Sequence, residues 1–483
     1  MTTSYQTFDV DPNLDESPKA GYDLDKGRIS GPDLVPKLNL GTSARAHREK
    51  RRSTVRRLYA LCFTTTILGA AMASAQLTWE DIAALNAKAK ALGWTFTVGE
   101  SFATQVPLEQ LCGLVVPDQW WEGARFNAFK QKVELPAAFD WRDYNGCTPV
   151  KDQQSCGSCW AFATVGAFEC AIKVKDGQDV SLSEQWLISC NQETEAPHVL
   201  GGAWGCNGGW WAHDYHAGIK TDPCGGSGAV LTTNFPYYAA DRPCDCPYPH
   251  GYTMDSWAYI GDPEGIPSVN AIKQAIAAYG PVSAGVYVDI SFASYRNGVF
   301  NASNNQEINH GIVLVGWDDN QGANGVWILR NSWGGGWGEG GYMRIEYGCS
   351  NVGFGACYVD YAGKGEAPGP TILKQPADCV IPLGWQHVFS VNATGTGILH
   401  YQWEHNGEDT GLDSPALVVE HASYGDGGTY VCRVSDIRGV SVSRTAELAI
   451  DPLQGVSVSH PFALVILVVV CVLQTRRLLR RSQ

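Results

Sequence analysis

Three side chains of this 483-residue sequence could together cleave an acyl bond: the thiol of Cys159, the imidazole of His310 and the carboxamide of Asn331. A cysteine thiolate is a strong nucleophile, and a nearby histidine can hold the thiol proton and later pass it to a leaving group. An asparagine in third place accepts a bond from the other ring nitrogen and orients the imidazole. Cysteine, histidine and asparagine in this order predict an activated-thiol acyl-transfer site.

The segments around Cys159 and His310 suit this chemistry. A free thiol has a pKa near 8.5, and a helix N-terminus beside an imidazolium can lower it greatly. Residues 160–169 contain neither proline nor a run of charges, so we expect a helix after Cys159 whose dipole favours the thiolate. His310 precedes the apolar run 311–317, which predicts a strand with the imidazole near its start.

The segment Gln153–Phe162 resembles the nucleophile signature of papain-like, cathepsin-type cysteine peptidases. Three more segments resemble the family's mature N-terminus, second helix and substrate-binding loop: residues 135–142, 181–190 and 205–209. The resemblance implies an α+β fold of two lobes, a helical lobe with Cys159 and a β-barrel-like lobe with His310 and Asn331. A polypeptide substrate would bind in the cleft between the lobes.

The resemblance also implies roles for neighbouring residues. Gln153 would join the Cys159 backbone N–H in an oxyanion hole, where losing one donor costs roughly two to three orders of magnitude in rate. Trp333 would shield the bond between His310 and Asn331 from water. Glycines let an extended substrate approach the backbone closely, and the resemblance places substrate at Gly208, Gly209, Trp211, Trp333 and Trp337.

Sixteen cysteines favour an oxidising compartment. Eleven lie from Cys147 to Cys357, and setting aside Cys159 leaves ten that could form five pairs: Cys156–Cys206, Cys190–Cys244, Cys147–Cys170, Cys349–Cys357 and Cys224–Cys246. The resemblance implies the first two, its cathepsin B-type members suggest the third, and the last remains by elimination. The fourth follows because Asn304 stands where the family has a cysteine. Zinc is the disfavoured alternative, because Cys224, Cys244 and Cys246 lack tetrahedral ligand spacing; we expect no metal and no cofactor.

The N-terminal segments predict export. Residues 1–43 are polar and acidic, which predicts disorder. Residues 44–75 combine a basic cluster, a short apolar run and a small-residue cleavage site, as in a secretory signal peptide. Because a signal peptide belongs at the N-terminus, either a cytoplasmic extension precedes it or the start codon is assigned too far upstream, and we favour the second.

Residues 76–134 are expected to form a propeptide that covers the cleft as an inhibitor. Apolar residues at three- and four-residue spacing predict an amphipathic helix near residues 79–92. The segment Leu108–Leu114 contains a Leu-Cys-Gly that resembles cathepsin B-type propeptides. A retained structural extension is the alternative. The peptidase would follow at residues 135–363.

A second domain is expected after a Gly/Pro-rich linker at residues 364–370. Residues 371–451 alternate short strands with turns, and two motifs, around Trp403 and Cys432, resemble an all-β immunoglobulin-like sandwich with Tyr430 at the tyrosine corner. A Cys379–Cys432 bridge stays open, because Cys379 lies farther from Trp403 than is usual.

The C-terminus predicts attachment to a surface. Residues 455–475 form an uncharged, mostly apolar segment, and the basic tail 476–483 follows. A membrane-spanning helix with a cytoplasmic tail and a sorting signal that is later cleaved explain this layout equally well. The net charge of −14 argues against a nucleic-acid partner, which needs a basic face.

These features predict a secreted, surface-attached cysteine endopeptidase made as a zymogen, with polypeptide substrates and its own propeptide as inhibitor. No His-rich occluding loop follows Gly209, which favours internal cleavage, and His213 and His216 fit a solvated helix face better than a metal site. The alternative is an inactive surface adhesion protein that binds an unknown ligand through its immunoglobulin-like domain. The complete set of Cys159, His310, Asn331 and Gln153 argues against it.

Overall fold

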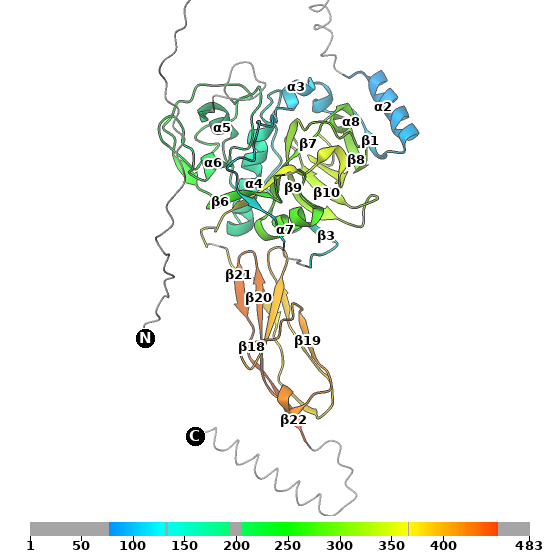
Figure 1. Ribbon diagram of the computed structural model, residues 1–483, viewed down its shortest axis with the longest axis vertical. Helices are drawn as coiled ribbons and strands as arrows, with labels where there is room; N and C mark the ends of the chain where they lie inside the picture. Colours follow the sequence, from blue (N-terminus) through cyan, green and yellow to red (C-terminus); the bar gives the residue numbers. More distant parts are fainter. Residues whose placement is uncertain (1–76, 131–133, 194–203, 264, 366, 453–483) are drawn as a thin grey trace, which may run out of the picture. The chain divides into compact units, whose positions relative to one another are not determined.

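The structure, a computed structural model, describes residues 77–130, 134–193, 204–263, 265–365 and 367–452 (Figure 1). The predicted leader segments and the predicted C-terminal helix and tail lie outside these described residues. Among the helices of the described ranges, none has both the length and the apolar composition needed to cross a bilayer.

Residues 77–130 belong to the expected propeptide and are called the prosegment below. They form five short elements: helix α2 (Trp79–Leu92), strand β1 (Thr95–Val98), 3₁₀ helix η1 (Phe102–Thr104), helix α3 (Leu108–Leu111) and strand β2 (Phe126–Asn127). Helix α2 confirms the predicted amphipathic helix. Thr78 and Asp81 form a capping box at its start, and Gly93, in the left-handed conformation at φ 67°, ends it. Leu85 and Ala89 are its buried residues.

Three helices form one side of residues 135–363, the expected peptidase: α4 (Cys159–Asp176), α5 (Glu184–Cys190) and α6 (His213–His216). Helix α4 begins at Cys159, as predicted, and is buried along its length except at Lys175. Gly177 ends it in the left-handed conformation at φ 71°. Helix α4 packs against strand β9 and helix α5 (Figure 1), so the first residue of α4 lies beside the main sheet.

The main sheet has ten strands, in the order β1-β8-β11-β10-β9-β7-β12-β6-β2 with β3 paired to β9. Its peptidase strands are β3 (Ala138–Asp140), β6 (Ser256–Ile260), β7 (Val282–Val286), β8 (Tyr295–Phe300), β9 (His310–Asp318), β10 (Val326–Arg330), β11 (Tyr342–Glu346) and β12 (Phe354–Asp360). Strand β9 confirms the predicted strand after His310 and lies between β7 and β10. The two end strands, β1 and β2, both belong to the prosegment.

The remaining peptidase elements are short or peripheral: helices α7 (Val269–Tyr279) and α8 (Ile290–Ala293), the 3₁₀ helix η2 (Cys349–Asn351) and the paired strands β4 (Ala229–Val230) and β5 (His250–Tyr252). Two buried clusters hold the peptidase together. One lies around the sheet and α7 and includes Trp317 and Trp327, and the other lies around α4 and α5 and includes Cys159 and Trp186.

Residues 371–451 are all-β with their own buried cluster. The strands are β13 (Thr371–Lys374), β14 (Cys379–Pro382), β15 (His387–Ser390), β16 (Asn392–Thr394), β17 (His400–His405), β18 (Glu408–Asp409), β19 (Ala416–Val419), β20 (Gly428–Asp436), β21 (Gly439–Val442) and β22 (Ala446–Asp451), with the 3₁₀ helix η3 (Tyr424–Asp426). Trp403 pairs with Cys432 across β17 and β20. The Tyr430 hydroxyl donates to the Asp426 carbonyl at 2.8 Å.

Among the described residues there are three disulfides: Cys156–Cys206, Cys190–Cys244 and Cys224–Cys246. The expected pairs Cys147–Cys170 and Cys349–Cys357 are corrected, because all four residues are free thiols. Cys349 belongs to the buried cluster of the sheet and α7, whereas Cys357 belongs to that of α4 and α5, so the two side chains pack in different clusters. Cys379 and Cys432 are also free.

Cys147 and Cys170 nevertheless touch. A hydrogen bond with the Cys147 thiol and the nearby Arg330 guanidinium lower the pKa of Cys170 to about 6, against the opposing effect of burial. Arg330 Nη1 lies 3.2 Å from Cys170 Sγ. The Arg330 guanidinium thus favours the ionised form of the Cys170 thiol.

The predicted solvated face at His213 and His216 is wrong, because both imidazoles are completely buried. Burial lowers the pKa of each to about 3, so both are neutral. His213 Nε2 lies 3.3 Å from the Cys357 sulfur. The imidazoles are buried because apolar residues distant in sequence pack around α6.

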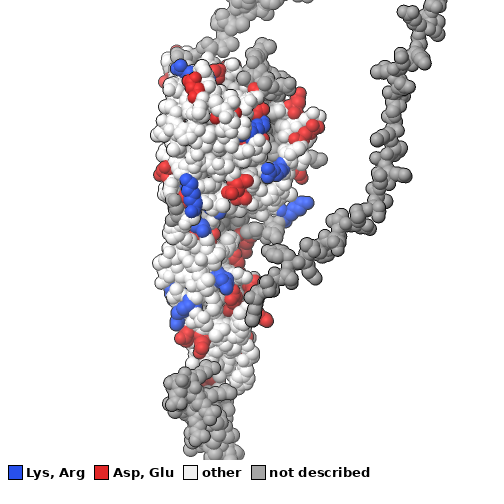
Figure 2. All heavy atoms as spheres, turned by 90° about the vertical axis from the view of Figure 1, so that its left-hand side faces the viewer, with Lys and Arg blue, Asp and Glu red and all other residues white. Residues whose placement is uncertain are grey.

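On the face shown in Figure 2, acidic and basic side chains lie scattered among neutral residues. No continuous basic patch is visible on the described part of that face.

Candidate active site

Antiparallel pairing of two strands brings His310 and Asn331 together. His310 is the first residue of β9, Asn331 follows β10 directly, and Arg330 of β10 pairs with Val313 of β9. His310 Nε2 lies 2.8 Å from Asn331 Oδ1, and both side chains are buried. Because this oxygen can only accept, the contact assigns the proton to Nε2 and leaves Nδ1 as the basic nitrogen.

Trp333 covers this pair. Its ring centroid lies 4.8 Å from that of His310, and only 1% of the residue is exposed. Trp337 lies behind it at 5.2 Å and donates its indole N–H to the Ala293 carbonyl. Trp211 is also buried and donates to the Gly355 carbonyl. Trp211 and Trp337 therefore belong to the interior here, whereas Trp333 packs directly on the imidazole.

The Gln153 carboxamide is fixed from both ends. Its Nε2 donates to the Leu111 carbonyl at 2.9 Å and to the Cys156 carbonyl at 2.8 Å. Its Oε1 accepts from the Ser332 hydroxyl at 2.6 Å. Sequence analysis missed Ser332, for which adjacency to Asn331 was the only signal.

The prosegment backbone crosses directly over Cys159. The Gly113 N–H donates to Cys159 Sγ at 3.2 Å. On one side Gly113 and Val115 exchange hydrogen bonds with Gly209, and on the other side the Leu114 N–H donates to the Asn309 carbonyl at 3.0 Å. An extended chain is thus held on both sides by backbone groups, next to the proposed nucleophile.

Glycines permit this close approach. A Cβ atom on Gly113 would lie 1.8 Å from the Gly157 carbonyl oxygen, far inside contact distance. Gly208 has φ +128°, a conformation that L residues rarely adopt, and a Cβ there would lie 2.8 Å from the Val115 side chain. The disulfide Cys156–Cys206 ties this glycine loop to the turn before Cys159.

Burial under the prosegment keeps the Cys159 and His310 side chains neutral. Loss of water raises the pKa of Cys159 to about 11, although backbone N–H groups of Gly311 and Gly113 oppose the rise. Burial lowers the pKa of His310 to about 4, against a smaller opposing contribution from the hydrogen bond with Asn331.

The expected thiolate–imidazolium pair is therefore absent from the described site. His310 Nδ1 has no hydrogen-bond partner among the described residues, and Cys159 Sγ accepts the Gly113 amide instead. The physical reason is desolvation, which disfavours two charges in a covered site.

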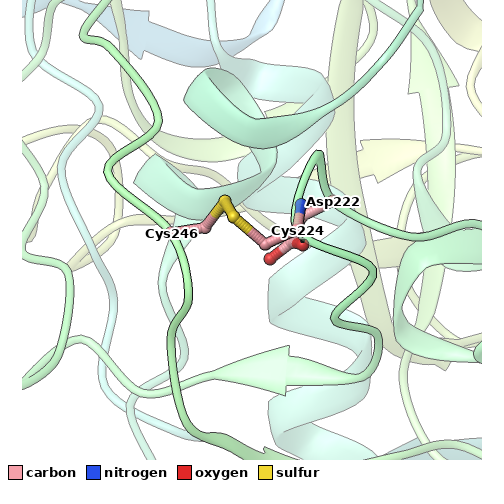
Figure 3. Close-up of side chains that lie close together, drawn as sticks. All are labelled: Asp222, Cys224 and Cys246. Carbon is pink, nitrogen blue, oxygen red and sulfur yellow. Dashed lines mark hydrogen bonds between the residues drawn. A yellow bond between two sulfur atoms is a disulfide. The ribbon is translucent and has the colours of Figure 1, made fainter.

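Cys224 and Cys246 do not form the zinc site considered from sequence. Their sulfurs are bonded to each other beside the Asp222 carboxylate (Figure 3). Asp222 Oδ1 accepts the backbone N–H groups of Cys224 and Gly226. Zinc binds thiolates, and this disulfide leaves none at the cluster.

Comparison with known proteins places this geometry in a family. The profile of papain family cysteine proteases matches residues 135–361. A senescence-specific cysteine protease of rice (Oryza sativa subsp. indica) is 38% identical over 215 residues, which are 44% of this chain and 58% of that protein. The chain thus spans little more than half the length of such plant relatives.

Two further relatives match over a greater length. Cathepsin S of Bos taurus is 35% identical over 243 residues, which are 50% of this chain and 69% of that protein. The solved structure of the digestive procathepsin L2 proteinase from the larval midgut of Tenebrio molitor matches with a TM-score of 0.50 and 29% identity, over 58% of this chain and 89% of that chain. The peptidase has the papain-like fold, and the chain belongs to the papain family of cysteine proteases.

Proposed function

We propose that this protein is the zymogen of a cysteine endopeptidase, with Cys159 as nucleophile, His310 as general base and acid, Asn331 as orienting residue and Gln153 as oxyanion donor. The observation that carries the proposal is the position of Leu111–Val115. A polypeptide backbone there contacts the Cys159 sulfur and the Gln153 amide at the same time. The matched relatives named as cysteine proteases support the same reaction.

In the mature enzyme, removal of the prosegment readmits water and substrate to the site. His310 Nδ1, the unprotonated nitrogen, then takes the Cys159 proton, and the N-terminus of α4 stabilises the thiolate. The thiolate attacks the substrate carbonyl carbon, and the developing oxyanion accepts hydrogen bonds from Gln153 Nε2 and the Cys159 backbone N–H.

The imidazolium then protonates the departing amine, which leaves an acyl group on Cys159. Water, deprotonated by His310, attacks this acyl group and regenerates the thiol. The Asn331 bond to Nε2 holds the ring plane throughout. Trp333 keeps water away from that bond.

We assign residues 76–134 as an inhibitory propeptide, residues 135–363 as the peptidase, residues 364–370 as a linker and residues 371–451 as an immunoglobulin-like domain with an unidentified ligand. The Trp403–Cys432 pair and the Tyr430 hydroxyl bond support the last assignment. The Leu-Cys-Gly at residues 111–113 supports kinship with cathepsin B-type propeptides. Secretion through residues 44–75 and surface attachment through residues 455–475 complete the proposal and rest on sequence composition.

Alkylation of the processed protein by an epoxysuccinyl inhibitor tests the function. We expect one covalent adduct on Cys159 by mass spectrometry, loss of hydrolysis of denatured protein, and no adduct in Cys159→Ser. Gln153→Ala should retain the adduct while kcat falls by roughly two orders of magnitude. Absence of labelling and hydrolysis in the processed, reduced protein would refute the proposal, and a biological effect unchanged in Cys159→Ser would favour a binding role.

A further inference from the structure

The prosegment makes a further contact with the peptidase, beyond its cleft residues 111–115. Beyond Val115 the chain places Trp120 against three peptidase rings, at centroid distances of 4.7 Å to Tyr259, 5.7 Å to Phe354 and 5.9 Å to Trp210. The Trp210 indole N–H donates to the Tyr259 hydroxyl at 2.8 Å, which fixes two of these rings.

Strand β6 adds backbone groups to the same surface. Strand β2 of the prosegment pairs with β6 in parallel, and the Arg125 carbonyl accepts the Tyr259 N–H at 2.9 Å. The Asn127 carbonyl accepts the Gly261 N–H at 2.7 Å. The Phe126 ring stacks on Tyr259 at 5.2 Å. When the prosegment leaves, β6 becomes an edge strand with these two N–H groups unpaired.

We propose that β6 and the three rings of Trp210, Tyr259 and Phe354, here called the aromatic edge site, form a polypeptide-binding site in the mature enzyme. Its ligand is an extended segment of a polypeptide substrate that carries an aromatic side chain. The inference rests on the proposed function, because removal of residues 76–134 exposes the site.

Three observations indicate that the ligand is an extended segment with an aromatic side chain. The prosegment is itself such a segment and is seated there, so the surface accepts an extended chain with aromatic side chains. The backbone bonds to β6 need no particular sequence, and the rings add a preference for aromatic residues. Trp210 directly follows Gly209, which holds the chain in the cleft, so one polypeptide reaches both places as the prosegment does.

A synthetic peptide of residues 117–130 is the probe, because it contains Trp120 and Phe126 but lacks the cleft residues 111–115. It is added to the processed enzyme together with either a blocked dipeptidyl aminocoumarin amide or a long, carboxymethylated polypeptide. We expect the peptide to slow hydrolysis of the long substrate at least about fivefold at saturation while the short substrate is hydrolysed at an unchanged rate. With a benzophenone side chain at position 120, the peptide should crosslink to residues 256–260 or to Phe354.

The chain offers a matched control in the neighbouring tryptophan. Trp120 is half-buried against the rings, whereas Trp121 is 44% exposed. The Trp120→Ala peptide should bind at least about tenfold more weakly than the unchanged peptide, and the Trp121→Ala peptide about equally well.

Equal binding of the two variant peptides, equal inhibition of short and long substrates, or crosslinking only elsewhere would overturn the proposal. So would a peptide that alters the oligomeric state without slowing the long substrate, which would assign the surface to a second copy of the chain. A processed enzyme that fails to hydrolyse even the short substrate would instead contradict the proposed function.

Discussion

The direction in which the Gln153 carboxamide points depends on one hydroxyl group. Ser332 Oγ donates to Gln153 Oε1 at 2.6 Å, which turns Nε2 toward the Leu111 carbonyl. A hydrogen bond of this kind contributes about 1 kcal/mol on average, and more where the unpaired partner stays buried. Ser332 therefore acts as a positioning residue for the oxyanion donor.

We expect Ser332→Ala to lower kcat of the processed enzyme about tenfold with little change in KM, because a misoriented donor weakens transition-state binding. Steady-state kinetics on a dipeptidyl amide measure both constants. Ser294→Ala is the control, because this buried hydroxyl donates only to a carbonyl of its own helix turn. An unchanged kcat in Ser332→Ala would show that Gln153 needs no such support.

Gly113 allows the prosegment backbone to lie close enough to cover the Cys159 thiol. In Gly113→Ala the new methyl group would lie 1.8 Å from the Gly157 carbonyl oxygen, so the prosegment must move away from the cleft. We expect the free energy that favours the closed position of the prosegment to fall by about 1–3 kcal/mol, which is the usual cost of overpacking a site. The rate at which iodoacetamide alkylates Cys159 in the unprocessed chain measures the open fraction and should rise accordingly. Gly123→Asn is the control, since its φ of 69° tolerates asparagine and no atom lies within 4 Å of its Cβ position.

At the scale of elements, the prosegment completes the main sheet of the peptidase at both ends. Strand β1 pairs with β8 at one end and β2 with β6 at the other. Unpaired sheet edges attract other strands, and β1 and β2 of the prosegment cover both edges of this sheet. Its attachment is therefore distributed over two edges and the cleft.

Phe96 anchors the first of these edges. It is 5% exposed and packs against Phe300 at 4.6 Å and Tyr295 at 6.0 Å. We expect Phe96→Ala to weaken prosegment closure by about 3 kcal/mol, since large-to-small changes of buried phenylalanine typically cost this much. The same alkylation assay should report a faster reaction of Cys159. Thr97→Ala, on the exposed face of the same strand, should leave the rate near that of the unchanged chain.

At the scale of the whole molecule, closure of the prosegment depends on pH through His310. Its pKa is about 4 when covered, and we take its ordinary value of 6.5 for the open state. Between pH 4 and pH 6.5 the open state therefore binds more protons than the closed state does. The contribution of His310 to closure is complete above pH 6.5, and up to about 3 kcal/mol of it is lost as the pH falls toward 4.

We expect acidification from pH 7 to pH 4.5 to open the zymogen. Hydrogen exchange of the Gly113, Leu114 and Val115 amides in Cys159→Ala, corrected for the intrinsic effect of pH, should accelerate over this interval without cleavage of the chain. The control is Cys159→Ala combined with His310→Gln, which should lose most of the dependence. Equal acceleration in both variants would assign the effect to other groups, such as the buried His213 and His216.

The sequence by itself determined the features that local rules govern. The apolar spacing near residues 79–92 predicted α2, the uncharged run after Cys159 predicted the start of α4, and the apolar run after His310 predicted β9. The family resemblance around Cys159 correctly indicated a papain-like peptidase. Such signals are readable because apolar periodicity acts between residues close in the chain.

Only the tertiary structure decided which residues meet across long separations. It oriented Gln153 with Ser332, 179 residues away, and buried His213 and His216, which the sequence placed at the surface. It also put Cys349 and Cys357 into different clusters and removed water from Cys159 and His310 so that both stay neutral. Burial and charge depend on which distant segments supply the surroundings, and a single sequence does not state those neighbours.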